Sequence, residues 1–259
     1  TSPLEFSDVS GSIIMLNTTP PLSGIGHSST VLGPDMDTYY IVYHTFIREG
    51  SRAMNIDPLS LNGKDFLSSG PTSTPQQAPK QPEISTDSKS KSDKFTYEKI
   101  SMKDSTILVQ QGGLVLSKDI ITSEKYTVEV NFKSITEKAG IVFSYVDSNN
   151  YTIAFIDVEK QELYIETYEN GERVSFVYTD LPTSFNKKVD FSVLQALSIK
   201  KDGKRYSFYL NGLSIATIGL NIPCGKIGVI AVNGEASLGY MAISFEANGS
   251  SLKTFYKPI

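Results

Sequence analysis

The sequence predicts an all-β protein made of two unlike parts. Short runs in which apolar and polar residues alternate fill most of the 259 residues, as expected of β-strands. Asn-Gly and Asp-Gly pairs separate several of these runs and indicate tight antiparallel hairpins. No long run repeats its apolar residues at the helical spacing of three and four. A polar segment at residues 67–93 divides the chain, so we expect one strand-rich part on each side of it.

The first part, residues 1–66, contains four predicted strands: Ser12–Leu16, Ser28–Leu32, Thr38–Phe46 and Arg52–Leu59. The third of these strands is apolar on both faces, with Tyr39, Ile41 and Tyr43 on one and Tyr40, Val42 and Phe46 on the other. A strand of this kind must be covered on two sides. The four strands alone cannot provide both covers, so a cover must come from material outside this chain or from its second strand-rich part.

The motifs of this part follow one another in a distinctive order. Gly24-Ile-Gly-His-Ser-Ser comes first, then Gly33-Pro-Asp, Tyr39-Tyr-Ile-Val-Tyr-His, and finally Arg52 before Met-Asn-Ile-Asp-Pro-Leu. This order resembles the last blade of the five-bladed propeller of glycoside hydrolase family 43, which contains arabinanases, arabinofuranosidases and β-xylosidases. The start of the chain also resembles the end of the preceding blade, although Glu5 departs from the family pattern.

The resemblance implies a partial β-propeller of about one blade at residues 1–66. A blade relies on its neighbours to bury its faces. We therefore expect the chain to be the C-terminal fragment of a longer enzyme, with the missing N-terminal blades of the same polypeptide as its partner.

The resemblance also implies a glycosidase that hydrolyses O-glycosyl bonds with inversion in arabinose- or xylose-containing plant polysaccharides. Inversion requires two carboxyl groups far enough apart to admit a water molecule. No match for the family's catalytic carboxylates occurs in this sequence. They are expected upstream, and this chain alone is expected to be inactive. Oligo- or polysaccharide is the expected ligand.

Two residues of the blade carry family roles by resemblance. His27 corresponds to the histidine near the propeller axis, where it contacts a hydrated cation, with calcium as the expected ion, or fixes the local hydrogen bonds. Arg52 corresponds to an arginine that faces the substrate pocket, where its guanidinium can donate to sugar hydroxyls. The alternatives are a loop histidine bonded to backbone and a solvated surface arginine. His44 is interpreted as a packing residue, and Asp35, Asp37 and Asp57 as structural carboxylates at turns and a strand end.

The segment 67–93 holds Pro, Ser, Thr, Gln and Lys with few apolar residues, and is predicted to be a linker. Residues 94–259 form the second part, with many short alternating strands between Thr106 and Phe245. This spacing predicts an antiparallel jelly-roll β-sandwich. Hairpins are expected at Asn170-Gly171, Asp202-Gly203 and Asn211-Gly212. The sandwich resembles the concanavalin A-like or laminin G-like modules that are appended to glycosidases.

The sandwich is predicted to be an accessory or substrate-shaping module. The alternative for the chain is a non-catalytic, lectin-like carbohydrate-binding module, and a third possibility is a purely structural sandwich. The chain has no Trp, so tyrosines would have to stack on sugars: Tyr145, Tyr151, Tyr164, Tyr168, Tyr178, Tyr206, Tyr209 and Tyr240. Packing within the sandwich is the default interpretation for each of them, and a calcium site at Asp147–Asn150 is a further alternative.

Composition excludes several partners. A net charge of −4 with 20% charged residues argues against nucleic acid, whose phosphates require concentrated Lys and Arg. No apolar run reaches the roughly 18 residues needed to cross a bilayer, so no membrane partner is expected. The family resemblance implies a secreted or periplasmic protein, although no signal peptide is visible in this chain.

Overall fold

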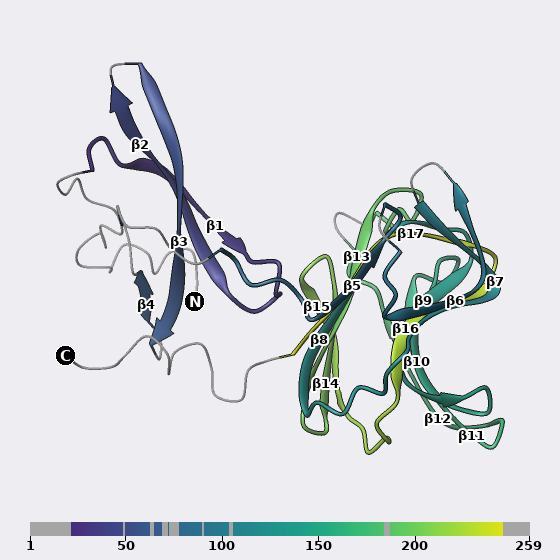
Figure 1. The fold of residues 1–259 in the computed structure, drawn as a ribbon. Coiled ribbons are helices and arrows are strands. Elements are labelled where there is room, and N and C mark those ends of the chain that lie inside the picture. The colour runs from purple at the N-terminus through teal and green to yellow at the C-terminus, as the bar shows by residue number, and fades with distance from the viewer. Residues whose placement is uncertain are drawn as a thin grey trace. The chain divides into compact units, whose positions relative to one another are not determined.

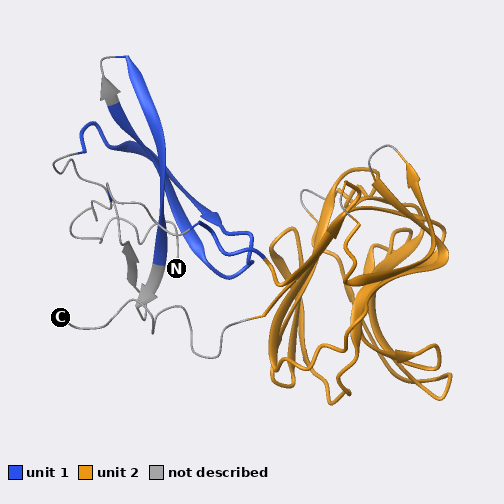
Figure 2. Cartoon of the chain, in the orientation of Figure 1, with its two compact units in different colours: residues 1–81, 247–259 blue, residues 82–246 orange. Residues whose placement is uncertain are grey.

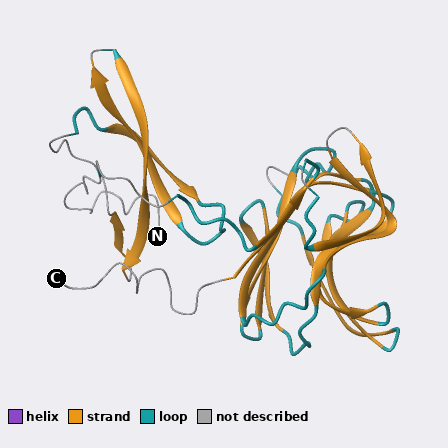
Figure 3. Cartoon of the chain, viewed as in Figure 1, coloured by secondary structure: helices purple, strands orange, loops and turns teal. Residues whose placement is uncertain are grey.

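The computed structural model describes residues 22–48, 50–62, 65–68, 72, 78–89, 91–103, 106–183 and 187–245. These residues form strands and loops without a helix, so the all-β prediction is confirmed (Figure 1 and Figure 3). Within the described ranges, no helix is long and apolar enough to cross a membrane.

The chain divides into two compact units (Figure 2). Unit 1 comprises residues 1–81 and 247–259, and unit 2 comprises residues 82–246. Strand β5 (Ile84–Asp87) lies inside the segment that was expected to be a linker, and it belongs to unit 2. It is ordered because its residues pair with Tyr240–Ile243 of β17 (Ala236–Phe245) and because Ile84 and Thr86 are buried.

The described part of unit 1 is an antiparallel sheet of four strands in the order β1-β2-β3-β4. The strands are β1 (Gly26–Leu32), β2 (Tyr39–Arg48), β3 (Ser51–Asn62) and β4 (Asp65–Ser68). The first three match predicted strands, whereas β4 was not expected and pairs with the end of β3. The predicted strand Ser12–Leu16 lies outside the described residues.

The two faces of this sheet differ in burial. Ile41, Tyr43 and Leu59 form a small buried cluster on one face. On the other face Met54 is 82% exposed, and Phe46 and Ile56 are exposed as well. On the first face Ile41 and Tyr43 of β2 are thus covered while Tyr39 is exposed, and on the second face Tyr40 is covered while Phe46 is exposed. The predicted cover on both sides of β2 is present in part.

Unit 2 contains thirteen strands in one hydrogen-bonded system with the order β12-β11-β10-β9-β16-β7-β17-β8-β13-β14-β15, to which β5 and β6 are added. Besides β5 and β17, the strands are β6 (Phe95–Lys103), β7 (Thr106–Ser117), β8 (Lys125–Ile135), β9 (Lys138–Asp147), β10 (Asn150–Asp157), β11 (Glu162–Glu169), β12 (Glu172–Asp180), β13 (Gln195–Asp202), β14 (Arg205–Leu210), β15 (Leu213–Gly219) and β16 (Lys226–Asn233).

Strand β7 connects two packed sheets. Its residues Leu114–Leu116 pair with β16, and its residues Ile107–Val109 pair with β17. Gln111-Gly112-Gly113 has the composition of a turn, which would divide this stretch into two strands. The structure instead has one bent strand, and β6 runs beside it through the bend, where Lys99 and Gly112 have positive φ angles of 47° and 66°.

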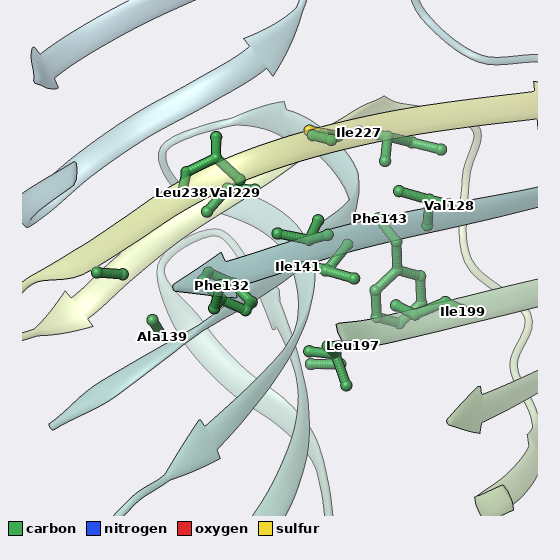
Figure 4. Close-up of a cluster of buried hydrophobic side chains, with 14 of the residues drawn as sticks. Val128, Phe132, Ala139, Ile141, Phe143, Leu197, Ile199, Ile227, Val229 and Leu238 are labelled. Atoms are coloured by element: carbon green, nitrogen blue, oxygen red, sulfur yellow. The ribbon is translucent and has the colours of Figure 1, made fainter. Parts of the chain in front are cut away.

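The core lies between the two sheets (Figure 4). Ile141 and Val229 come from the β9–β16 sheet, and Val128 and Leu197 from the β8–β13 sheet, and all four are 0% exposed. Burial of this kind contributes about 1.5–3 kcal/mol for each large apolar side chain. The inward positions therefore hold the sandwich together, and the outward positions of each strand are available for other roles.

The predicted hairpins are present. Asn170 and Gly171 both have positive φ between β11 and β12, and Asn211 and Gly212 both have positive φ between β14 and β15. This is the conformation of a type I′ turn, which Asn-Gly favours. The third hairpin, between β13 and β14, turns at Gly203, whose φ is 60°.

Strands β9 and β10 approach so closely at Gly140 that no side chain fits there. A Cβ on Gly140 would lie 2.0 Å from the carbonyl oxygen of Ala154 and 2.4 Å from the Cα of Phe155. Both are backbone atoms, so neither can move without shifting the strand.

We therefore expect Gly140→Ala to destabilise the protein by about 3 kcal/mol, the upper end of the range for overpacking. Thermal and urea unfolding measure this loss. Gly219→Ala is the matched control, because nothing lies within 4 Å of the position that its Cβ would take and it should unfold like the wild type. Equal stability of both variants would contradict this account of the β9–β10 contact.

Candidate functional site

Unit 1 brings the two predicted site residues to one sheet. In the strand register Gly26 lies opposite His44, and His44 lies opposite Met54. Phe46 lies opposite Arg52 on the same face. We call this set, His27, His44, Phe46 and Arg52, the histidine face.

His27 has an unusual backbone conformation. It lies in an irregularity of β1 between Gly26 and Ser29, and its φ is 51°. A bulge of this kind redirects a side chain, and non-glycine residues in the left-handed region are uncommon. The result is that the imidazole rings of His27 and His44 lie 5.7 Å apart between centroids.

Arg52 is exposed, and its guanidinium lies over the ring of Phe46, with 5.6 Å between Cζ and the ring centroid. His44 lies 6.0 Å from the same ring. Partial burial lowers the pKa of His44 below its usual value, and the positive charges of Arg52 and His27 lower it further. His44 therefore favours the neutral form.

The acidic residues of this unit have structural roles, as predicted for Asp35 and Asp57. Asp35 accepts hydrogen bonds from the backbone N–H and the hydroxyl of Thr38 at 3.0 and 2.7 Å. Asp57 is buried and accepts from the hydroxyl of Tyr43 at 2.6 Å and from the hydroxyl of Thr72 at 2.7 Å. Neither carboxylate is available for acid or base chemistry.

The expected cation has few ligands here. Among the described residues, no group of three or more His, Cys, Asp or Glu side chains could hold a metal ion. His27 supplies one nitrogen, whereas calcium prefers six to eight oxygen ligands. The described residues therefore do not form a calcium site by themselves, and the calcium at the propeller axis stays a prediction.

Unit 2 has a second group of candidate residues, on the outward side of the sheet that contains β9, β10, β11 and β12. Alternate residues of these strands point away from the core and carry aromatic rings. We call this surface the aromatic face; its rings are Tyr145, Tyr151, Phe155, Tyr164, Tyr168, Phe176 and Tyr178.

The rings form two groups at different levels along the strands. The tyrosine row crosses from β9 to β11: Tyr145 and Tyr151 are 6.3 Å apart, and Tyr151 and Tyr168 are 4.7 Å apart. The edge group crosses from β10 to β12 and consists of Phe155, Tyr164, Phe176 and Tyr178, with neighbouring centroids 5.2 to 5.8 Å apart.

Charged side chains lie among the rings. Glu166 is 7% exposed and accepts hydrogen bonds from the hydroxyl of Tyr168 at 2.7 Å and from Arg173 Nη1 at 2.8 Å. Arg173 also lies over the ring of Phe176, 4.7 Å from its centroid. Because the carboxylate is paired, its burial is tolerated, and both partners hold fixed positions on the face.

The tyrosine hydroxyls remain protonated at neutral pH. Burial raises the pKa of Tyr145, Tyr151 and Tyr168, and for Tyr168 the hydrogen bond to Glu166 raises it further. Tyr164 donates to Glu162 and accepts from Lys160 Nζ at 3.0 Å. Tyr164 and Tyr168 donate their single phenolic hydrogens to Glu162 and Glu166, whereas Tyr145 and Tyr151 can donate to another acceptor.

The eight tyrosines that the sequence analysis named as candidates for sugar stacking lie in different places in the structure. Five of them share the aromatic face, whereas Tyr206 is a core residue and Tyr209 and Tyr240 lie in the other sheet. Phe176, Arg173 and Glu166 were not predicted. The pattern Tyr164-x-Glu166-x-Tyr168 is a signal that could have found Glu166, since alternate residues of a strand share a face.

The Asp147–Asn150 turn is held by its own side chains. The carboxylate of Asp147 accepts from the backbone N–H of Asn149 at 2.8 Å and from Asn150 Nδ2 at 2.9 Å. These bonds lower the pKa of Asp147. The carboxylate therefore stabilises the turn, and among the described residues Asp147 belongs to no group of three or more His, Cys, Asp or Glu side chains that could hold a metal ion. The alternative calcium site stays a prediction.

No protein-family model and no curated protein matches the sequence. Solved structures do match. The carbohydrate-binding module CBM66 of Bacillus subtilis is 17% identical with a TM-score of 0.45, over 60% of this chain and 96% of that one. A GH43 protein of Bacillus licheniformis is 15% identical with a TM-score of 0.49, over 89% of this chain and 55% of that one.

A third match is a β-1,3-1,4-glucanase, or lichenase, derived from a mouse hindgut metagenome. It is 11% identical with a TM-score of 0.46, over 63% of this chain and 99% of that one. The present chain thus spans about half the length of the GH43 protein. At these identities and TM-scores, none of the three assigns a function to this chain.

The histidine face makes a prediction about protonation. Replacing Arg52 with Gln removes one positive charge, so the pKa of His44 should rise toward its usual value, while the effect of burial remains. The pKa of His44 is lower in the folded protein than in the unfolded chain, so lowering the pH from the unfolded to the folded pKa favours unfolding. The variant, in which the two pKa values are closer, should lose less stability as the pH falls. An NMR titration of the His44 ring protons measures the shift. Arg205→Gln, in unit 2, is the control, and an unchanged pKa in Arg52→Gln would contradict the proximity of the two side chains.

Proposed function

We propose that unit 2 binds carbohydrate through the aromatic face and serves as the accessory module of a glycoside hydrolase acting on arabinose- or xylose-containing plant polysaccharides. The observation that carries this proposal is the combination on one face of exposed rings, fixed charged groups and tyrosine hydroxyls. Sites for neutral polar ligands combine apolar contact area with a few placed polar groups.

The exposed rings supply the apolar contact. Tyr178 and Phe176 are 56% and 43% exposed, although both belong to a sheet whose other outward rings are largely covered. The C–H faces of a sugar ring pack against aromatic surface of this kind, and an aromatic side chain buries a large area while losing little conformational freedom.

The ion pair of Arg173 and Glu166 supplies hydrogen bonds that can orient the ligand. Arg173 uses Nη1 on Glu166, which leaves further N–H donors of the same guanidinium for a ligand. Sugar hydroxyls are good acceptors for such donors, and hydrogen bonds to charged groups contribute more than those between neutral groups. The cation–π contact of Arg173 with Phe176 keeps the guanidinium beside the exposed rings.

The tyrosine row supplies hydroxyl groups. Tyr168 is engaged with Glu166, whereas within the described residues the hydroxyls of Tyr145 and Tyr151 have no hydrogen-bond partner. A half-buried hydroxyl without a protein partner is a group that a ligand hydroxyl can satisfy.

A glycosidase role for unit 1 is the second candidate, favoured by the convergence of His27, His44 and Arg52 on one face of its sheet. In this proposal the exposed apolar side of that sheet packs against further propeller blades, which contribute the catalytic carboxylates, and the protein is secreted or periplasmic. The alternative to both is a non-catalytic, lectin-like module that uses the aromatic face alone.

Truncation of the exposed ring tests the first proposal. Tyr178→Ala should weaken binding to arabinan, arabinoxylan or xylan by about tenfold, as expected when an aromatic contact with the ligand is lost. Affinity electrophoresis in gels that contain each polysaccharide measures the change. Tyr209→Ala is the matched control, because Tyr209 is a half-buried tyrosine of the other sheet and its loss should leave migration unchanged.

A wild-type chain that no plant polysaccharide retards would overturn the proposed function. Equal weakening by Tyr178→Ala and Tyr209→Ala, with both variants folded by circular dichroism, would remove the aromatic face as the site.

The glycosidase proposal is tested in the full-length gene product. His27→Ala and Arg52→Ala should each lower the rate of arabinan or arabinoxylan hydrolysis by tenfold or more, on the order expected for loss of a positioned polar group. Tyr209→Ala, in unit 2 and outside both proposed sites, serves as the control. Full activity in both the His27 and the Arg52 variant would exclude their predicted roles.

A further inference from the structure

We infer that the aromatic face takes a linear sugar chain rather than a single terminal sugar, with several consecutive rings bound between the tyrosine row and the exposed rings of strand β12. This inference rests on the proposed function and concerns the class of carbohydrate. It follows from the spacing of the two ring groups and from the different contacts that they offer.

The two groups occupy different levels of the same strands. On β10, Tyr151 of the tyrosine row and Phe155 of the edge group are four positions apart, and on β11 the same separation lies between Tyr168 and Tyr164. Four residues of a strand extend about 13 Å. One pyranose or furanose ring is much smaller than this distance, so a monosaccharide reaches one group only.

The two groups also differ in what they present to a ligand. The rings of the tyrosine row stack on one another, with an interplanar angle of 18° between Tyr151 and Tyr168, so their faces are largely occupied. They offer mainly hydroxyl groups. In the edge group Phe176 and Tyr178 are exposed and offer ring surface. Hydrogen bonding at one end and stacking at the other are complementary contacts for one ligand that spans both.

Charged and apolar side chains also lie between the two ring groups. Glu166 lies between Tyr164 and Tyr168 on β11, and it pairs with Phe176 in the register of β11 and β12. Its ion pair with Arg173 is therefore placed midway, where the inner rings of a bound chain would present their hydroxyls. The neighbouring position on β10 is Ile153, which is buried and provides an apolar floor.

The ends of the face agree with a chain that continues past it. Strand β12 is the last strand of its sheet, and its side chains are exposed along nearly the whole strand. At the level of the edge group no further strand of that sheet lies beyond Tyr178 among the described residues. Tyr178 is 56% exposed at this edge, so a chain that lies across it is not enclosed there, whereas a pocket for a chain end would be.

Isothermal titration with a length series tests the inference, using xylose to xylohexaose and arabinose to arabinohexaose. The affinity of the preferred series should rise at least tenfold from the monosaccharide to the tetramer or pentamer and then level off, once the chain spans both ring groups. Tyr178→Ala should flatten this rise, because the edge group is then lost, while Tyr178→Phe should keep it. Tyr209→Ala is the control and should preserve the full length dependence.

The outcomes separate the two proposals. A monosaccharide that binds as tightly as the longest oligomer would overturn the chain inference and leave carbohydrate binding intact. A length dependence that Tyr178→Ala does not change would also overturn it, since the chain would then lie elsewhere. Failure of every oligosaccharide and polysaccharide to bind would overturn the proposed function itself.

Discussion

The sandwich depends on strand β7, which runs through both of its sheets with β6 paired beside it. Residues Ile107–Val109 of β7 pair with β17, and residues Leu114–Leu116 pair with β16, so the two layers cannot separate without straightening the bend. Val109 and Val115, on the two sides of the bend, enter the same core and are both fully buried. The bend thus fixes the distance between the layers, and the core residues of each sheet meet because of it.

This constraint also orients the aromatic face. Once Val115, Ile141 and Ile165 point into the core, strand alternation turns Leu116, Val142 and Tyr164 to the opposite side. The outward side of a sheet ordinarily carries polar residues. Here it is mainly apolar and aromatic across β9, β10 and β11, which is why it differs from an ordinary solvated surface.

The sequence allowed the strands of the sandwich and its hairpins to be predicted, because alternation and Asn-Gly pairs act over a few residues. It did not reveal the bend of β7, since Gln111–Gly113 has the composition of a turn. It also did not reveal β5: the string Ile84-Ser-Thr-Asp has no strong pattern and becomes a strand through pairing with β17. The aromatic face could not be predicted from the sequence either, because the alignment of Tyr151 with Tyr168 depends on the register between two strands.

Strand β12 combines an open edge with apolar side chains, and this has a consequence for the behaviour of the protein in concentrated solution. Among the described residues, the outer edge of β12 has no hydrogen-bonded neighbour strand, so the peptide groups beside Val174, Phe176 and Val177 form a template on which another extended chain could assemble. The charges of Glu172, Arg173 and Asp180 along the same strand oppose such assembly, as gatekeeper residues do in many β-proteins. Arg173 would then have two roles, since the guanidinium that is proposed to bind the ligand would also help to keep neighbouring molecules apart.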